Sequence, residues 1–142
     1  MKFVQDNHSP SKPVGMVRGL HYQSPPEAQD KLVLCGAGVV FDVRVGSPTY
    51  GDWVRMELSA EDGWQLLIPK GFLHGFVIRA PDVELLYKCS DVDTPDCDGA
   101  DHYADPDLAL DWRIDAADVI LSPKDTCARR FAGFKSPFVY EG

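Results

Sequence analysis

The chain has 142 residues, 44% of them hydrophobic and 25% charged, and a net charge of −8. Its length is typical of a single domain, so we expect residues 1–142 to form one. The apolar content excludes a disordered chain, and the lack of an 18-residue apolar run argues against a membrane protein. The negative net charge argues against a protein that binds nucleic acid.

The N-terminus and the cysteines indicate a reducing compartment. Residues 1–13 are polar and lack the apolar segment of a secretory signal peptide, so we expect a cytoplasmic protein. The four cysteines include no C-x-x-C pair, which argues against a zinc ribbon or a thioredoxin-like motif. Cysteines of a cytoplasmic protein are expected to be reduced.

Short strands dominate the predicted elements. Alternation and turn residues predict strands over 39–45, 52–58, 64–69, 72–79 and 83–89. In the first, the apolar side chains at 39, 41, 43 and 45 share one face, and Asp42 and Arg44 lie on the other. Regularly spaced short strands are typical of an antiparallel sandwich or barrel, so we predict an all-β fold with little helix.

The last third of the chain contains the predicted loop and helix. Residues 91–107 are acidic and show no alternation, which predicts a long loop. Ser122 is a good helix N-cap, because Pro123 and an acidic residue in the first turn follow it. On this reading Asp125 is a carboxylate at a helix N-terminus.

Three polar residues fall on apolar faces of predicted strands. Since residues of equal parity share a face, Lys31, His74 and Tyr87 are expected to point into the space that a barrel encloses. An inward histidine or tyrosine alone is commonly a hydrogen-bonded core residue. An inward lysine is rarely buried without a partner or a wet cavity, so it favours a functional site. Arg18 and His21 have opposite parity and can reach one cavity only if the strand has a bulge at Gly19 or ends near position 20.

A metal site is the alternative use for inward histidines. The four histidines form no H-x-H or H-x-x-x-H pair. A facial triad of His21, His74 and Glu84 is conceivable, but Glu84 has the opposite parity to Tyr87 and should point outward. We therefore predict no metal ligands.

Motifs along nearly the whole chain resemble those of the dTDP-4-dehydrorhamnose 3,5-epimerase family. In chain order they are Phe3-Val4-Gln5-Asp6-Asn7-His8-Ser9, Val17-Arg18-Gly19-Leu20-His21-Tyr22-Gln23, Lys31-Leu32-Val33, Ser47-Pro48-Thr49-Tyr50-Gly51, Leu58-Ser59-Ala60-Glu61, Ile68-Pro69, Gly71-Phe72, His74-Gly75-Phe76, Tyr87-Lys88, Asp105-Pro106-Asp107-Leu108, Leu121-Ser122 and Lys124-Asp125. The resemblance implies a cupin-like antiparallel jelly-roll barrel, a homodimer, and an enzyme that uses no metal or other cofactor.

The resemblance also implies a reaction. The substrate is a nucleotide-linked 4-keto-6-deoxyhexose, in which C3 and C5 are both α to the ketone and carry acidic protons. His21 matches the family's base, and Asp125 matches the carboxylate that orients it. Lys31 matches the group that stabilises the enolate oxygen, with His74 nearby, and Tyr87 matches the proton donor.

The resemblance further implies a binding set for the nucleotide diphosphate and the sugar. The matching positions are Gln5, Asn7, Arg18 and Lys124, and Asp98 could replace an acid of the family. A narrower enzyme, which inverts one carbon or isomerises the ketone, stays open. A non-catalytic sugar-nucleotide-binding or assembly protein is the alternative from another class, but it would not need a base, an oxyanion partner and an acid together.

Three departures from the family pattern carry expectations of their own. Family members usually have an N-terminal arm before the segment that begins here with Phe3, and we expect its absence to weaken the dimer. Two adjacent tyrosines are replaced by Val92 and Asp93, and a Glu-Arg-Gly-Ile stretch by residues 98–101. The last two changes predict an altered substrate pocket around an intact proton-transfer core.

Overall fold

Strands make up most of the regular structure in the computed structural model, which describes residues 1–9, 13–81 and 83–142. The strands are β1 (Gln5–Ser9), β2 (Met16–Gln23), β3 (Lys31–Asp42), β4 (Trp53–Leu58), β5 (Leu66–Ile68), β6 (Phe72–Val77), β7 (Leu85–Cys89), β8 (Asp98–Ala100) and β9 (Ile120–Leu121). Helix is confined to α1 (Pro123–Thr126) and two 3-10 turns, Pro95–Cys97 and Ala116–Asp118. The predicted all-β class with little helix is therefore confirmed.

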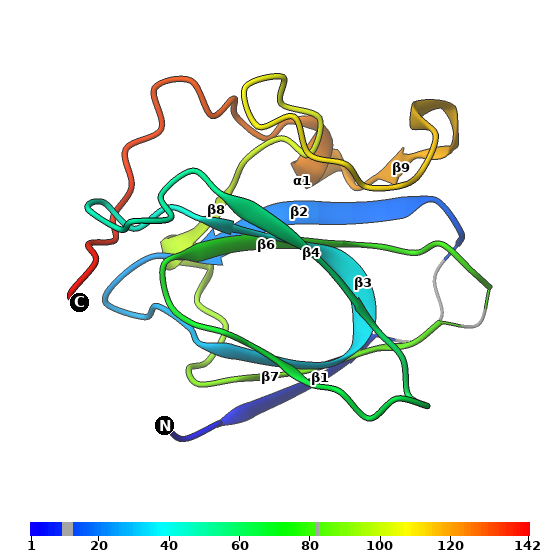
Figure 1. The fold of residues 1–142 in the computed structure, drawn as a ribbon, viewed down its shortest axis with the longest axis horizontal. Helices are drawn as coiled ribbons and strands as arrows, with labels where there is room; N and C mark the ends of the chain where they lie inside the picture. The colour runs from blue at the N-terminus through cyan, green and yellow to red at the C-terminus, as the bar shows by residue number, and fades with distance from the viewer. Residues whose placement is uncertain (10–12, 82) are drawn as a thin grey trace.

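The strands curl around one another in the order β1-β7-β3-β6-β2-β8. β3 is long enough to belong to both sides of the curl, because its first residues pair with β5 and β7 and its later residues pair with β4 and β6. Figure 1 shows β2, β4 and β6 on one side of the resulting open barrel and β1 and β7 on the other. All of these pairings are antiparallel except that of β9 with β2.

A register shift between Val33 and Cys35 lets both halves of β3 contribute to the barrel interior. Val33 from the first half packs with Val40 and Met56, and Tyr87 of β7 packs against this cluster. The opposite face of the β2–β6 layer is covered by the C-terminal third of the chain, whose Trp112 belongs to the larger core. The larger core therefore lies between the β2–β6 layer and the C-terminal third of the chain.

Two features of the predicted strand over 39–45 need correction, its end point and the exposure of Asp42. Residues 39–42 are the end of β3 rather than the start of a strand that reaches 45; Val45 is 51% exposed and makes only an isolated bridge to Val139. Asp42, predicted on a polar face, is 2% exposed. Burial opposes its ionised form, but hydrogen bonds from Arg44 and nearby hydroxyl groups outweigh it and lower the pKa of the Asp42 carboxyl. These hydrogen bonds to Asp42 stabilise the turn that ends β3, so the alternation of inward and outward side chains does not continue beyond it.

The predicted loop at 91–107 is partly structured. It contains a 3-10 turn and β8, which pairs with β2 opposite residues 21–23. Alternation of side chains does not reveal this strand, because it is only three residues long and is held by backbone hydrogen bonds to β2. The predicted helix after Ser122 is present, and its N-cap hydroxyl accepts a hydrogen bond from the Asp125 amide.

The state of the cysteines and the length of the helices bear on the expected compartment and on membrane insertion. Cys35, Cys89, Cys97 and Cys127 are all free thiols. Among the described residues, none of the helices has the length and apolar character needed to cross a membrane. A cytoplasmic location stays a prediction.

Candidate active site

A polar cavity of about 510 Å³ opens between β2, the start of β3 and β7. Its lining residues are Arg18, His21, Tyr22, Gln23, Gln29, Lys31, Tyr87, Asp93, Asp98, Ser122, Pro123 and Lys124. Six of the ten residues singled out from the sequence are in this set. His74 and Asp125 lie directly behind it, in contact with two of the lining side chains.

The centre of the site is a histidine held by a buried carboxylate. His21 Nε2 lies 2.6 Å from Asp125 Oδ1, and the two side chains are 24% and 1% exposed. The Ser122 hydroxyl donates to the other carboxylate oxygen over 3.0 Å. Because a carboxylate only accepts, Nε2 carries the proton and Nδ1 remains as the basic nitrogen. The arrangement is that of a base fixed in one tautomer and one orientation.

Asp125 satisfies both interpretations that its sequence position allowed. It lies in the first turn of α1, where its amide bonds to the Ser122 cap, and its side chain reaches His21 on β2. The short helix α1 therefore positions the Asp125 carboxylate next to the His21 ring.

Arg18 and His21 share the cavity through an irregularity in β2. Arg18 pairs with Phe76 and His21 with His74, and the register shifts between these two pairs. Gly19 allows the close approach, because its φ is +129° and an added Cβ would lie 2.5 Å from the Gly75 Cα. Parity allowed either a bulge at Gly19 or a strand that ends near position 20. The structure has the register shift, and β2 continues to Gln23.

Lys31 and His74 form a second polar pair next to the base. Lys31 Nζ lies 3.2 Å from His74 Nε2, and His74 Nδ1 lies 3.1 Å from the His21 carbonyl oxygen. An ammonium only donates, so Nε2 accepts and Nδ1 donates, which makes the His74 ring neutral. Removal from water, and then the charge of Lys31, hold the pKa of His74 well below its usual value.

Lys31 is the cation that an anionic intermediate would meet at the inner end of the cavity. Burial lowers its pKa, and the acidic groups of Cys89, Asp98 and Asp93 partly offset that effect. The Lys31 ammonium lies 5.8 Å from the centre of the Tyr87 ring. A partly desolvated ammonium stabilises a nearby oxyanion more strongly than one in water.

Tyr87 lines the cavity from the β7 side. It is partly buried in the cavity wall, and burial, with a smaller contribution from Cys89, raises the pKa of its phenol. The hydroxyl therefore stays protonated at neutral pH and is able to donate. His21 and Tyr87 come from different strands, β2 and β7, so the two side chains can approach a bound molecule from different directions.

The structure places Gln5 and Asn7 beside the cavity rather than in its wall. Both lie on β1, where Asn7 is opposite Tyr87. The Gln5 amide donates to Asn7 Oδ1 over 3.0 Å and accepts from the backbone N–H of Asp93 over 3.0 Å. Asn7 Nδ2 contacts the sulfur of Cys89 at 3.5 Å. Of these hydrogen bonds, only the one between Gln5 and Asp93 reaches a residue that lines the cavity.

Arg18 and Lys124 provide cations at the cavity, and Lys124 forms an ion pair with Asp98.

Some lining residues were not predicted from the sequence. They are Tyr22, Gln23, Gln29, Ser122 and Pro123, and Asp93 was noted only as a departure from the family pattern. The family resemblance of Lys124-Asp125 indicated Asp125 as a site residue, and the N-cap at Ser122 indicated only its place in the first turn of a helix. Nothing in the spacing of the glutamines indicates the loop contacts they make.

The conceivable metal triad is not assembled. Glu84 lies 2.9 Å from His8 on the outer surface, as its parity predicted. Within residues 1–9, 13–81 and 83–142, no three His, Cys, Asp or Glu side chains are arranged to hold a metal ion.

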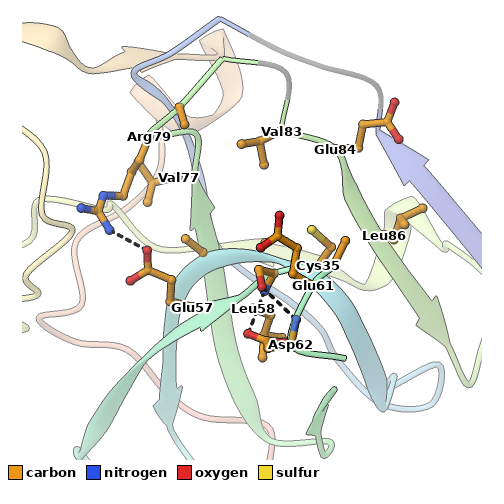
Figure 2. A pocket seen from close by; sticks show the side chains of 15 residues that line it. Cys35, Glu57, Leu58, Glu61, Asp62, Val77, Arg79, Val83, Glu84 and Leu86 are labelled. Carbon is orange, nitrogen blue, oxygen red and sulfur yellow. Dashed lines mark hydrogen bonds and ion pairs between the residues drawn. The ribbon is translucent and has the colours of Figure 1, made fainter. Parts of the chain in front are cut away.

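A second cavity of about 770 Å³ lies where β4 and β6 end and β7 begins (Figure 2). Its walls are mainly apolar, including Leu58 and Leu86, and carboxylates such as Glu61 line it as well. Of its described lining residues Arg79 is the only cation, and it pairs with Glu57 over 3.2 Å. Although larger, this cavity lacks the base, acid and cations that converge in the first.

The family model and two of the curated relatives that match this chain carry the same name. The family model described as dTDP-4-dehydrorhamnose 3,5-epimerase matches residues 1–133. The chain is 47% identical over 136 residues to the dTDP-4-dehydrorhamnose 3,5-epimerase of Pseudomonas aeruginosa, covering 93% of this chain and 74% of that protein. It is 46% identical over 127 residues to the Sinorhizobium fredii enzyme of the same name, with 87% and 65% covered, so it spans about two-thirds of that relative's length.

Solved structures share the fold over most of the chain. A crystal structure of dTDP-6-deoxy-D-glucose-3,5-epimerase from Legionella pneumophila, in complex with dTDP-4-keto-L-rhamnose, superimposes with a TM-score of 0.89 at 44% identity, covering 99% of this chain and 77% of that one. A 3'-monoepimerase from Streptomyces bikiniensis, in complex with dTDP-quinovose, superimposes with a TM-score of 0.81 at 34% identity, covering 92% and 67%. The cupin-like barrel expected from the motifs is thereby confirmed.

Proposed function

Because the chain belongs to the dTDP-4-dehydrorhamnose 3,5-epimerase family, a family of sugar-nucleotide isomerases, we propose that it inverts C3, C5 or both of a nucleotide-linked 4-keto-6-deoxyhexose. One observation carries the proposal most directly: the His21–Asp125 pair faces Lys31 and Tyr87 across one cavity. A relative in complex with dTDP-4-keto-L-rhamnose supports the substrate class.

The proposed reaction begins with removal of a proton by His21 Nδ1. The C–H electrons move into a C–C double bond, and the C4 carbonyl oxygen becomes an enolate oxygen. The Lys31 ammonium stabilises that charge, and the neutral His74 behind it holds the lysine in place.

Inversion requires the returning proton to arrive on the opposite face of the sugar. Tyr87 is the proposed donor, because its phenol stays protonated and lies on a different strand from His21. Water then restores the tyrosine and histidine protonation states. Arg18 and Lys124 are proposed to bind the diphosphate, and a guanidinium can hold two of its oxygens at once.

Assembly is a separate proposal. We propose that the protein works as a homodimer, as the family resemblance implies. The support in this chain is the exposure of large apolar side chains, with Val54, Trp64 and Leu67 at 60%, 72% and 45%. Such side chains are typical of a surface that a partner covers.

The test is incubation of the protein with dTDP-4-keto-6-deoxyglucose in D2O, followed by NMR. We expect deuterium at C3, C5 or both, together with inverted product, and an unchanged rate after exhaustive chelation because no proposed step uses a metal. Binding without any deuterium uptake would overturn the proposal in favour of a non-catalytic sugar-nucleotide-binding protein. Loss of activity on chelation, restored by metal, would contradict the proposed mechanism.

A further inference from the structure

Residues 91–94, which follow β7, are held against the cavity by three glutamine side chains. The Gln23 amide, only 6% exposed, donates to the Val92 carbonyl over 2.9 Å and accepts from the Thr94 N–H over 3.0 Å. Gln29 Nε2 donates to the Asp91 carbonyl over 2.8 Å, and Gln5 accepts the N–H of Asp93 over 3.0 Å. The backbone of this segment is therefore fixed on both sides of Asp93.

The fixed segment presents Asp93 to the cavity, where it is a lining residue. Lys31 and Tyr87, the two groups proposed to meet the reacting part of the substrate, line the same cavity as Asp93. The charge of Asp93 makes a small contribution that raises the pKa of each of them. The other lining carboxylate, Asp98, is neutralised by Lys124. Asp93 takes part in none of the ion pairs found among the described residues.

Asp93 is exposed to solvent at the cavity, so a ligand that covers its carboxylate must replace the hydrogen bonds that water would give it. A nucleotide diphosphate is an anion, so a second negative charge in the wall opposes its binding unless hydrogen bonds compensate. A carboxylate is acceptor-only, and a 4-keto-6-deoxyhexose offers two hydroxyl donors, at C2 and C3. Since Asp93 shares the cavity wall with Lys31 and Tyr87, the groups proposed to act on the hexose, we infer that its partner is the hexose rather than the nucleotide.

We propose that Asp93 is a specificity-determining residue that accepts a hydrogen bond from the C2 or C3 hydroxyl of the hexose. This inference rests on the proposed function and narrows its substrate to sugars that carry a donor at one of these carbons. Once the bound sugar covers Asp93, the site discriminates against analogues that lack the donor, because the carboxylate is then removed from water without a partner.

The experiment compares the parent sugar nucleotide with its 2-deoxy and 3-deoxy analogues, using deuterium exchange at C5 as the readout of kcat/KM. Wild-type protein should favour the parent over one analogue by about 10- to 100-fold, the range for a hydrogen bond to a charged group. In Asp93→Ala that ratio should fall to near one, and Asp93→Asn should retain an intermediate preference. Asp96→Asn is the matched control, because Asp96 is exposed on the adjacent 3-10 turn and does not line the cavity. It should keep the wild-type ratio.

A parallel measurement separates this inference from the proposed function. Dissociation constants of C4-reduced sugar nucleotides, with and without each hydroxyl, report the same discrimination without enolisation. If wild-type protein binds but never exchanges, the proposed function fails, while the ratio of dissociation constants still tests Asp93. If both ratios are the same in wild-type protein and Asp93→Ala, Asp93 does not read the sugar and the inference is wrong.

Discussion

The proposed role of His21 as the base depends on the tautomer that Asp125 favours. The 2.6 Å contact to Asp125 Oδ1 directs the Nε2 proton away from the substrate and leaves Nδ1 free. Replacing His21 with Asn keeps a polar side chain but removes the basic nitrogen. We expect solvent exchange to fall by about 10²- to 10⁴-fold, the range for loss of a general base. NMR exchange rates in D2O check this, and near wild-type exchange would assign the base to another residue.

Asp125→Asn is the companion variant, and its effect should be smaller because the imidazole remains. The amide can present an N–H to Nε2 and so favour the wrong tautomer, which lowers the fraction of competent base. The Ser122 cap should still form, since it bonds to the backbone amide of residue 125. Circular dichroism that matches wild-type protein, with exchange between that of wild type and His21→Asn, is the expected result.

The variant Tyr87→Phe should distinguish the two proposed proton transfers, removal by His21 and return by Tyr87. Tyr87→Phe removes one oxygen and keeps the ring that packs against the interior cluster, so stability should change little. His21 can still form the enolate and return a proton to the face it came from. The variant should exchange deuterium while producing little inverted sugar, and one NMR time course follows both. Unchanged inversion would show that another group or water is the donor.

The neutral state of His74 predicts a pH dependence of stability. Its pKa is well below the ordinary value of about 6.5, so below that pH the unfolded chain binds a proton that the folded chain does not. The free energy of unfolding should therefore fall with pH below about 6.5, by up to about 1.4 kcal/mol per pH unit from this residue, down to the folded pKa.

Urea denaturation of wild-type protein and His74→Gln between about pH 7 and 5 measures that slope. Glutamine can still accept from Lys31 and donate to the His21 carbonyl, but it does not titrate. The variant should lose less stability over this range. Parallel curves for the two proteins would mean that His74 protonates normally in the folded state.

At the scale of elements, the contact between β2 and β6 determines which β2 residues face the cavity. An alanine Cβ at Gly19 would lie 2.5 Å from the Gly75 Cα and 3.0 Å from the His74 carbonyl oxygen, both backbone atoms that cannot rotate away. Gly19→Ala should destabilise the protein by about 1–3 kcal/mol beyond its conformational strain and reduce exchange, because the strands must separate where Arg18 and His21 are set.

Gly51→Ala is the matched control for that variant. Gly51 also has a positive φ, +90°, but nothing lies within 4 Å of an added Cβ. It should therefore show only the conformational cost of about 1 kcal/mol. Chemical denaturation of both variants measures the difference, and equal losses would argue that the close approach of β2 and β6 has no energetic consequence.

At the scale of the whole molecule, the proposed homodimer is the property that most needs a measurement. Sedimentation velocity at micromolar concentration should give a dimer. Trp64→Ser should shift the equilibrium toward monomer if the exposed indole, 72% accessible in the single chain, is covered by the partner. A wild-type protein that is monomeric throughout that range would contradict the proposed assembly.

The alternation of the sequence determined the fold class and the inward direction of several side chains, because a strand places successive residues on opposite faces whatever it packs against. Lys31, Tyr87 and the outward Glu84 could be assigned in this way, and family motifs added the roles of His21 and Asp125. The tertiary structure decided what joins distant segments: the shift between Arg18 and His21, the contact of His21 with a residue 104 positions away, and the glutamines around Asp93. A bulge and a long-range hydrogen bond leave no periodic trace, since they depend on how two strands or loops meet and not on the pattern within either.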